Sequence, residues 1–370
     1  MLQIKDITLE NLMDFANSDE YRQMKDIPIS MARINSYRNN PRGSGGDAVL
    51  FIAYWNNKYV GYLGAMPDII FVTGEPVKVA WLSCMWVEKE YRRKGVALDL
   101  MNHAYKTWKG QLVITNYIPQ AKAVYNKTNS YTILKSIDGV RAYLRFDTAT
   151  LLTRKFRNLQ KFKLFFRMSD LILNFICDTR FIFIKKRKRL KEFNIEEISN
   201  PDRSINEFID KYSGNTVSER KAEDFNWLMN YPWVREGKLP DEEQSKYAFT
   251  VVCKKFKQLF LKITDKQNNA VAFLVLTHKN KELKTPYLFF QKEYTPVVWE
   301  VIRNYMIKNK ICNLITFNYE LQKFILENRL SFIYKKKAVY SSLISKLLLD
   351  KTGLKDSIIM YDGDGDAMFT

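Results

Sequence analysis

The chain has 370 residues and a mass of 43.7 kDa, with 46% hydrophobic and 14% aromatic side chains. This length exceeds the usual single domain and this composition can fill packed cores, which excludes a disordered chain, a collagen-like fibre and a disulfide-stapled miniprotein. The 59 Lys and Arg outnumber the 40 Asp and Glu, and the resulting net charge of +19 leaves three partner classes open: nucleic acid, an anionic membrane or an acidic ligand.

The four cysteines are widely separated along the chain: Cys84, Cys177, Cys253 and Cys312. None has the short spacing of a zinc ribbon or a redox pair, and the chain has only two histidines, so we expect no metal site. Reduced cysteines and an N-terminus without an apolar run predict a cytoplasmic protein. The apolar stretch 164–184 is interrupted by charged residues and is not expected to span a bilayer.

The first 150 residues alternate strand and helix patterns. The segment 79–87 is long, apolar and rich in strand formers, which predicts a buried central strand. Apolar residues recur at helical spacing from Val96 to Trp108, which predicts an amphipathic helix. The other predicted elements are strands at 48–54, 59–65 and 112–115, a helix at 119–127, and strands at 131–136 and 140–146.

A short basic loop, Arg92-Arg93-Lys94-Gly95-Val96-Ala97, joins the central strand to the following helix. The N-terminus of a helix presents unpaired N–H groups and a partial positive charge, and a glycine there lets an anion approach the backbone. The loop therefore predicts a phosphate-binding site. It has neither the spacing of a Walker loop nor the three glycines of a Rossmann fingerprint.

This segment resembles the acyl-CoA signature of the GCN5-related N-acetyltransferase (GNAT) superfamily. That signature is Gln or Arg, two residues of any type, Gly, one residue of any type, and Gly or Ala, and Arg92, Gly95 and Ala97 match it. The family's second block, an Asn followed by an Ala with a Tyr four residues later, is matched by the residues Asn116, Ala121 and Tyr125.

The second block departs from the family pattern in two ways. The usual Gly-Phe is replaced by Asn129-Ser130-Tyr131, and the gap between Asn116 and Ala121 is longer than usual. The resemblance covers residues 1–147.

The resemblance implies that acetyl-CoA is the acyl donor and that transfer to a bound amine is direct. The pantetheine arm would pair with the backbone of Met85, Trp86 and Val87, and the pyrophosphate would bind the loop. Tyr125 would be the general acid that protonates the departing thiolate. The cofactor-binding residues expected in full are Met85, Trp86, Val87, Arg92, Arg93, Lys94, Gly95, Val96, Ala97 and Asn116.

The general base is not assigned by the sequence. The central strand 79–87 contains no carboxylate, and Ser83 and Cys84 within it could only anchor a water molecule. Asp68, Glu75 and Glu88 lie nearby in the sequence, but each is expected to be a surface or packing residue.

Residues 151–191 hold 13 basic and 2 acidic side chains, a net charge of +11, and form a basic connector. Within it Leu164, Met168, Leu171, Ile172 and Phe175 recur at helical spacing. Two interpretations stay open: a solvated helical linker between domains, or a peripheral contact with an anionic membrane. No nucleic-acid recognition motif is present, so nucleic acid is not expected as a partner.

Residues 287–343 repeat the order of strands and helices of 81–146, with strands at 247–252, 259–263 and 270–277 before them. The loop 291–296 has no glycine, and Ile325 takes the position of Tyr125. We therefore expect a second, degenerate GNAT-like domain without acyl-CoA binding. The C-terminal Asp-x-Asp-x-Asp run lacks the Gly and Glu of an EF-hand and is not expected to bind calcium.

The predicted architecture is α/β, with two GNAT-like domains that each contain a mixed, mostly antiparallel sheet flanked by helices. The expected segments are an acyl-CoA domain at 1–147, the helical connector at 148–191, the degenerate domain at 192–346 and a tail at 347–370.

The expected function is acyl-CoA-dependent N-acylation of a small amine, such as an amino sugar or an amino-acid derivative. Two alternatives stay open: a Fem-type aminoacyl transferase that uses aminoacyl-tRNA, and a non-enzymatic module that binds CoA or a polyanion.

Overall fold

The computed structural model describes residues 1–72, 74–115, 117, 119–183, 188–214, 216–327, 332–354 and 358–369. The chain forms two compact units, each built from separate segments. Unit 1 consists of Met1–Ile137, Ser199–Gln258 and Tyr340–Thr370, and unit 2 consists of Asp138–Ile198 and Leu259–Val339. These units do not coincide with the consecutive segments 1–147, 148–191, 192–346 and 347–370 that the sequence predicts. The functions expected of those segments stay predictions.

Unit 1 is built on a mostly antiparallel sheet with the strand order β1–β2–β3–β4–β5–β14. The exception is β4, which runs parallel to β5. The strands are β1 (Leu2–Thr8), β2 (Ala48–Trp55), β3 (Lys58–Val72), β4 (Glu75–Val87), β5 (Leu112–Thr115) and β14 (Tyr334–Ser345).

The helices of unit 1 come from all three of its segments. They are α1 (Leu12–Asn17), α2 (Asp19–Gln23), α3 (Met31–Arg38), η1 (Lys89–Tyr91), α4 (Val96–Thr107), α5 (Pro119–Thr128), α8 (Arg203–Ser213), α9 (Ala222–Asn230), α10 (Glu242–Lys246), α13 (Lys346–Thr352) and η5 (Gly365–Phe369). A small two-stranded sheet pairs β8 (Arg235–Glu236) with β9 (Val252–Cys253). The amphipathic α4 buries Val96, Leu100, Met101 and Ala104 in the core, as its apolar spacing predicts.

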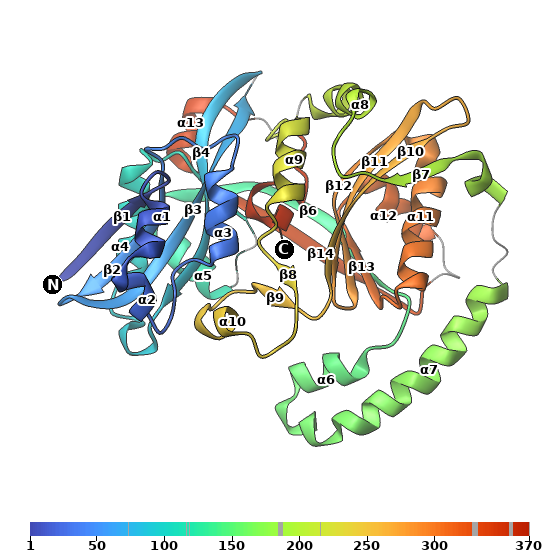
Figure 1. Cartoon of the computed structure of the whole chain (residues 1–370), viewed down its shortest axis with the longest axis horizontal. Helices are drawn as coiled ribbons and strands as arrows, with labels where there is room; N and C mark the ends of the chain where they lie inside the picture. Colours follow the sequence, from blue (N-terminus) through green and yellow to red (C-terminus); the bar gives the residue numbers. More distant parts are fainter. Residues whose placement is uncertain are drawn as a thin grey trace. The chain divides into compact units, whose positions relative to one another are not determined.

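Unit 2 repeats this topology with the strand order β7–β10–β11–β12–β13–β6. Here β12 runs parallel to β13, and β13 pairs antiparallel with β6. The strands are β6 (Tyr131–Tyr143), β7 (Asn194–Glu197), β10 (Phe256–Thr264), β11 (Ala270–Lys279), β12 (Glu282–Phe290) and β13 (Asn313–Thr316). The helices are α6 (Thr148–Lys155), η2 (Arg157–Phe162), α7 (Lys163–Phe183), η3 (Lys188–Glu192), η4 (Lys292–Tyr294), α11 (Thr295–Lys308) and α12 (Tyr319–Glu327) (Figure 1).

Each unit takes the last strand of its sheet from a chain segment that begins in the other unit. The strand β6 follows α5 of unit 1, but its C-terminal half pairs with β13 of unit 2. The strand β14 follows α12 of unit 2, and its C-terminal residues Ser342–Ile344 pair with β5 of unit 1. Because the strands that follow α5 and α12 are exchanged, each unit is assembled from discontinuous segments.

Three local expectations differ from the structure. The two strands expected at 131–136 and 140–146 are the single strand β6, in which Gly139 allows close approach of β13: a Cβ there would lie 2.6 Å from the carbonyl oxygen of Thr316. The strands that the repeat predicts at 331–334 and 338–343 are likewise, over the described residues, one strand, β14. The strand expected at 247–252 is reduced to the two-residue β9.

Among the described residues, no helix combines the length and the apolar character needed to cross a membrane; this includes α7. The described residues also contain no group of three or more His, Cys, Asp or Glu side chains that could hold a metal ion. The mixed α/β architecture with mostly antiparallel sheets confirms the predicted fold class.

Candidate active site

The two central strands of unit 1, β4 and β5, are paired over only part of the length of β4. The strand β4 pairs with β5 at Ala80, Trp81 and Leu82, and no described residue of β5 pairs with it beyond Leu82, although β4 continues to Val87. Met85, Trp86 and Val87 therefore lie on β4 beyond this separation, where the sequence predicts the pantetheine arm. No described residue of β5 pairs with them, and the Val87 carbonyl oxygen accepts a hydrogen bond from Arg92.

A β-bulge lies at the same place. Tyr62 pairs with Trp86 and Gly64 pairs with Ser83, so that Cys84 and Met85 together stand opposite one residue of β3. Cys84 has a φ of 55°, which is unusual for a residue other than glycine. A bulge bends the strand and re-aims its side chains.

The loop before α4 presents a group of free backbone donors. Arg93 and Gly95 both have left-handed conformations, with φ of 65° and 91°. Gly95 is the N-cap of α4 and provides no side-chain cap. The backbone N–H groups of Arg93, Gly95, Val96 and Ala97 have no acceptor among the described residues. Such a nest of N–H groups at a helix N-terminus is suited to a phosphate group.

The basic side chains of this loop, Arg92, Arg93 and Lys94, are exposed. Arg92 donates through Nε to the carbonyl oxygen of Val87 at 2.9 Å, which ties the loop to the end of β4. The Lys94 ammonium lies 4.9 Å from the centre of the Tyr91 ring. The predicted residues Arg92 to Ala97 thus lie together with the end of β4, whereas Asn116, also predicted to bind the cofactor, lies outside the described residues.

Tyr125 lies on α5 in the core that α4 and α5 form against the sheet. Only 7% of its surface is exposed, and its ring packs edge-on against Tyr117 with the centroids 5.9 Å apart. Its hydroxyl has no hydrogen-bond partner among the described residues. Burial raises the pKa of Tyr125, and nearby Asp366 and Tyr117 raise it further, so the phenol stays protonated and able to donate a proton.

Asp366 is a carboxylate that sequence reasoning missed. It is partly buried in η5, and the Oγ1 atom of Thr115 donates to its Oδ1 at 3.1 Å. Burial raises the pKa of Asp366, although Arg33 and the hydroxyls of Thr115 and Ser83 act in the opposite direction. The carboxylate therefore lies where β4 and β5 separate, within the electrostatic reach of Tyr125.

Arg33 contributes a buried cation from α3. Its Nη1 donates to Ser83 Oγ at 2.6 Å, and its guanidinium lies 3.7 Å from the ring centre of Trp233. Trp233 in turn stacks on Phe369 with centroids 4.1 Å apart. Three distant segments of the chain thus meet beside the bulge of β4. No sequence pattern marks Arg33, because its role depends on this long-range packing.

The C-terminal segment is held in unit 1 by several contacts. Asp364 is fully buried and accepts a hydrogen bond from Ser218, and Gln258 donates to the carbonyl oxygen of Met368 at 2.7 Å. Gly365 has a φ of 73°, and a Cβ there would lie 2.8 Å from the Trp81 ring. These contacts of the acidic C-terminal run place Asp366 against the sheet.

Asp68 has a structural environment. Arg220 Nη2 donates to its Oδ2 at 2.6 Å, Arg42 Nη1 to its Oδ1 at 3.1 Å, and the Trp81 indole to its Oδ2 at 2.6 Å. Burial alone would raise the pKa of Asp68, but the two guanidinium groups outweigh burial and lower it. A carboxylate that is ionised and fully bonded is a poor general base, so we do not assign Asp68 that role.

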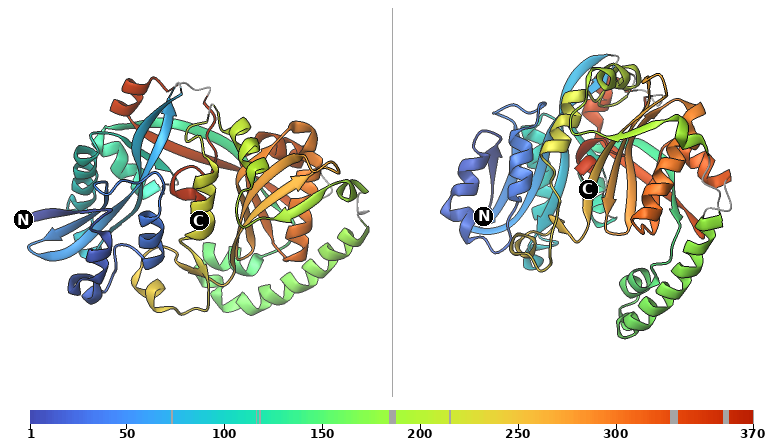
Figure 2. Two further views of the ribbon diagram at one scale, coloured as in Figure 1. Left: turned by 45° about the horizontal axis from the view of Figure 1, so that its top comes forward. Right: turned by 45° about the vertical axis from the view of Figure 1, so that its right-hand side comes forward.

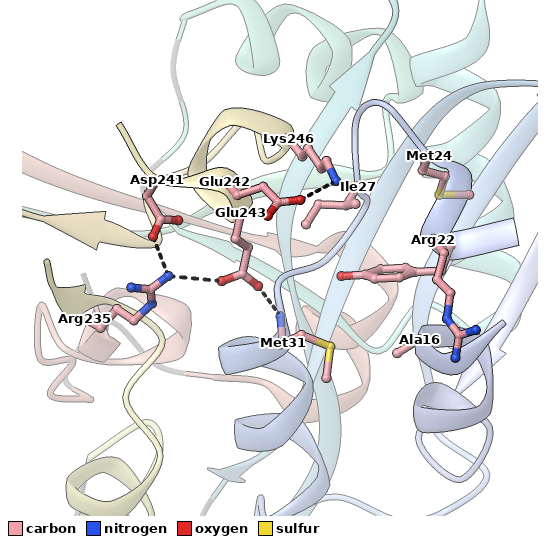
Figure 3. A pocket seen from close by; sticks show the side chains of 11 residues that line it. Ala16, Arg22, Met24, Ile27, Met31, Arg235, Asp241, Glu242, Glu243 and Lys246 are labelled. Atoms are coloured by element: carbon pink, nitrogen blue, oxygen red, sulfur yellow. Dashed lines mark hydrogen bonds and ion pairs between the residues drawn. The ribbon is translucent and has the colours of Figure 1, made fainter. Parts of the chain in front are cut away.

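A pocket of about 480 Å³ opens in unit 1 between α2, the start of α3 and α10 (Figure 3). Glu243 on its wall accepts from the backbone N–H of Met31 at 2.7 Å and lies 3.9 Å from Arg235. Met31 on its wall lies two residues before Arg33 on the same helix, α3.

The equivalent position in unit 2 is chemically different. A pocket of about 570 Å³ lies at the start of α11 and beside α12, and Glu293, Glu320 and Glu327 line it together with two lysines. The N-cap of α11 is Tyr294 with a φ of −86°, and a proline in the first turn removes one N–H donor. Ile325 is fully buried in the core. These residues do not fit a pyrophosphate group.

Comparisons with known proteins give a family for part of the chain and a fold for most of it. Residues 46–129 match a family model described as an acetyltransferase (GNAT) domain. A search of curated proteins finds no match.

Two solved structures show the fold. A GCN5-related N-acetyltransferase from Anabaena variabilis is similar with a TM-score of 0.50 and 12% identity over 92% of this chain and 72% of that one. The Saccharomyces cerevisiae N-myristoyltransferase with bound myristoyl-CoA is similar with a TM-score of 0.50 and 10% identity over 93% of this chain and 79% of that one. Residues 46–129 thus match an acetyltransferase domain of the GNAT type, and the two solved structures share the fold of the chain.

Proposed function

We propose that the chain transfers an acetyl group from acetyl-CoA to the amine of a small acceptor, using a site in unit 1. The observation that supports this most directly is the nest of free N–H groups at Arg93–Ala97, next to the place where β4 and β5 separate. With a phosphate group on the nest, Met85–Val87 would hold the pantetheine arm and Tyr125 would face the thioester. When bound, acetyl-CoA supplies the activated acyl group.

The reaction needs one proton acceptor and one proton donor from the chain. We assign Asp366 to remove the proton from the attacking amine and Tyr125 to protonate the departing sulfur. The new C–N bond forms as the C–S bond breaks, and Asp366 then returns its proton to the Tyr125 phenolate. The raised pKa of Asp366 makes it a stronger base than an ordinary carboxylate, and the raised pKa of Tyr125 keeps the donor protonated.

The pocket of Figure 3 supports a small acceptor. Its volume of about 480 Å³ is within the range of small-molecule sites. Its wall carries Asp241, Glu242 and Glu243, which pair with Arg235 and Lys246 of the same wall, so the pocket offers a small polar acceptor groups of both signs. The acceptor would approach past α3, whose Arg33 lies beside Ser83 and Asp366.

Unit 2 is proposed to bind no acyl-CoA, because its acidic pocket lacks a left-handed glycine at the helix start. A preparation of the full chain should bind one acetyl-CoA per chain.

The test is a screen of small amines with acetyl-CoA that measures the free thiol released. We expect acceptor-dependent thiol release by the wild type and a strongly reduced rate for Tyr125→Phe. A donor series from acetyl-CoA to myristoyl-CoA in the same assay measures the preferred chain length. Acetyl-CoA binding without turnover on any amine would favour a CoA-binding module instead.

A further inference from the structure

The helix α7 exposes a continuous apolar face. Leu171 and Phe175 are 72% and 71% exposed, and the remaining members of this face are also more than half exposed. At 100° per residue they fall within one arc of the helix that is about 140° wide. The face consists of Phe165, Met168, Leu171, Ile172, Phe175 and Ile176, together with Leu164 at its start.

The polar side of α7 is the side that packs on unit 2. Asp170 accepts from the backbone N–H groups of Thr148 and Ala149, each at 3.0 Å. Asn174 accepts from the backbone N–H of Phe146 at 2.8 Å, and Asp178 pairs with Arg145. These bonds fix the rotation of the helix, so its apolar face points away from the residues that anchor it. The usual amphipathic arrangement, with the apolar side buried, is reversed.

The charge around this face is of one sign. Residues 151–191 contain only two acidic side chains, Asp170 and Asp178, and both are engaged in the anchoring contacts. Six cations of this segment are exposed and form no ion pair with a described carboxylate. They are Arg154, Lys155, Arg157, Lys161, Lys163 and Arg167.

We propose that α7 docks on an anionic phospholipid surface, with its apolar face in the boundary between headgroups and acyl chains. A basic helix with a wide apolar arc of Leu, Ile, Met and Phe has the chemistry of an interfacial helix, and the surrounding cations match anionic headgroups. A second copy of the chain is a poorer occupant, because it would bring another segment of net charge +11 against the first. The helix lies at the edge of unit 2 beside α6 (Figure 2). This proposal does not depend on the acyl-transfer reaction.

The experiment is sedimentation of the full-length protein with vesicles of phosphatidylcholine alone or phosphatidylcholine mixed with phosphatidylglycerol. We expect binding to the mixed vesicles at least about tenfold tighter than to the neutral ones, and weaker binding at high salt. Leu171→Glu combined with Phe175→Glu should abolish binding. Both side chains are exposed, so the variant should fold and bind acetyl-CoA as the wild type does.

The matched control is Tyr319→Glu combined with Leu326→Glu, which adds the same charge at exposed positions of α12 in the same unit. This control should bind vesicles like the wild type. Absence of vesicle binding by the wild type, equal binding to neutral vesicles, or binding retained in Leu171→Glu/Phe175→Glu would each overturn the proposal. A concentration-dependent dimer that this variant abolishes, without vesicle binding, would assign the face to a second copy and would also overturn it.

Discussion

The hydroxyl of Thr115 donates a hydrogen bond of 3.1 Å to the carboxylate of Asp366, and this contact joins the end of β5 to the C-terminal segment. A strand near the middle of unit 1 and a residue 251 positions later in the chain thus meet at one point. Because β4 and β5 separate at the same point, the C-terminal segment supplies the carboxylate that the central strand lacks.

Replacement of Asp366 by Asn should lower kcat without lowering the stability of the fold. Asn keeps the hydrogen bond to Thr115 but cannot accept a proton, so kcat should fall by roughly 10²–10⁴ with little change in acetyl-CoA affinity. The pKa of Asp366 is raised in the folded state, so the folded chain binds more protons than the unfolded chain above the ordinary value of 3.8. Stability therefore falls as the pH rises through this window, and Asp366→Asn should melt at the same or a higher temperature at pH 7.

The measurements are steady-state kinetics across pH and thermal unfolding at pH 7. Asp362→Asn removes a carboxylate from the same segment and should keep normal turnover. If Asp366→Asn lowers the melting temperature and leaves kcat intact, the carboxylate has a structural role and is not the base.

Tyr125→Phe tests the general acid. Phe keeps the ring contact with Tyr117 but removes the proton donor, so kcat should fall by roughly 10²–10⁴ while KM for acetyl-CoA changes little. The control is Tyr131→Phe, because the Tyr131 hydroxyl is buried and has no hydrogen-bond partner. Wild-type turnover in Tyr125→Phe, with chemistry shown to limit the rate, would make Tyr125 a packing residue.

Asp68→Asn tests the buried charge network of unit 1. The change removes one of the two buried carboxylates that Arg42 and Arg220 share and leaves both guanidinium groups with Asp224 alone, so the free energy of unfolding should fall by about 3–5 kcal/mol. Since the folded-state pKa of Asp68 lies below 3.8, its contribution is present above that pH and is lost as the pH falls below it.

Denaturant unfolding measures this loss, and the exposed pair of Arg203 and Glu207 provides the comparison. Glu207→Gln should cost less than about 1 kcal/mol. A similar small loss for Asp68→Asn would show that the network adds nothing to stability.

The local part of the site could be predicted from the sequence, because its chemistry lies in short segments. The glycine of the loop, the apolar strand before it and the amphipathic helix after it are neighbours in the chain, and Arg92–Ala97 form the expected helix start. Tyr125 also lies on a short helix near the central strands, as expected; its role and those of the predicted cofactor-binding residues stay predictions.

The long-range part could not be predicted in the same way. Arg33, Thr115 and Asp366 meet only when three distant segments pack together, and no spacing rule connects them. The sequence also did not predict that β6 pairs with β13 of unit 2 and that β14 pairs with β5 of unit 1, because a strand's sequence does not show which sheet it joins.

The central claim is tested most directly by calorimetric titration of acetyl-CoA into the wild type, Gly95→Glu and Gly74→Glu. Gly95 has a φ of 91°, and a glutamate there adds both a side chain and a negative charge to the phosphate site. Gly74 has a similar φ of 85° in open space between β3 and β4, and its variant imposes a similar backbone strain elsewhere. We predict one site per chain in the wild type and in Gly74→Glu, and a loss of roughly a hundredfold or more in affinity for Gly95→Glu, at about 1.4 kcal/mol per tenfold. Unchanged affinity in Gly95→Glu, or two acetyl-CoA molecules bound per chain, would contradict the account.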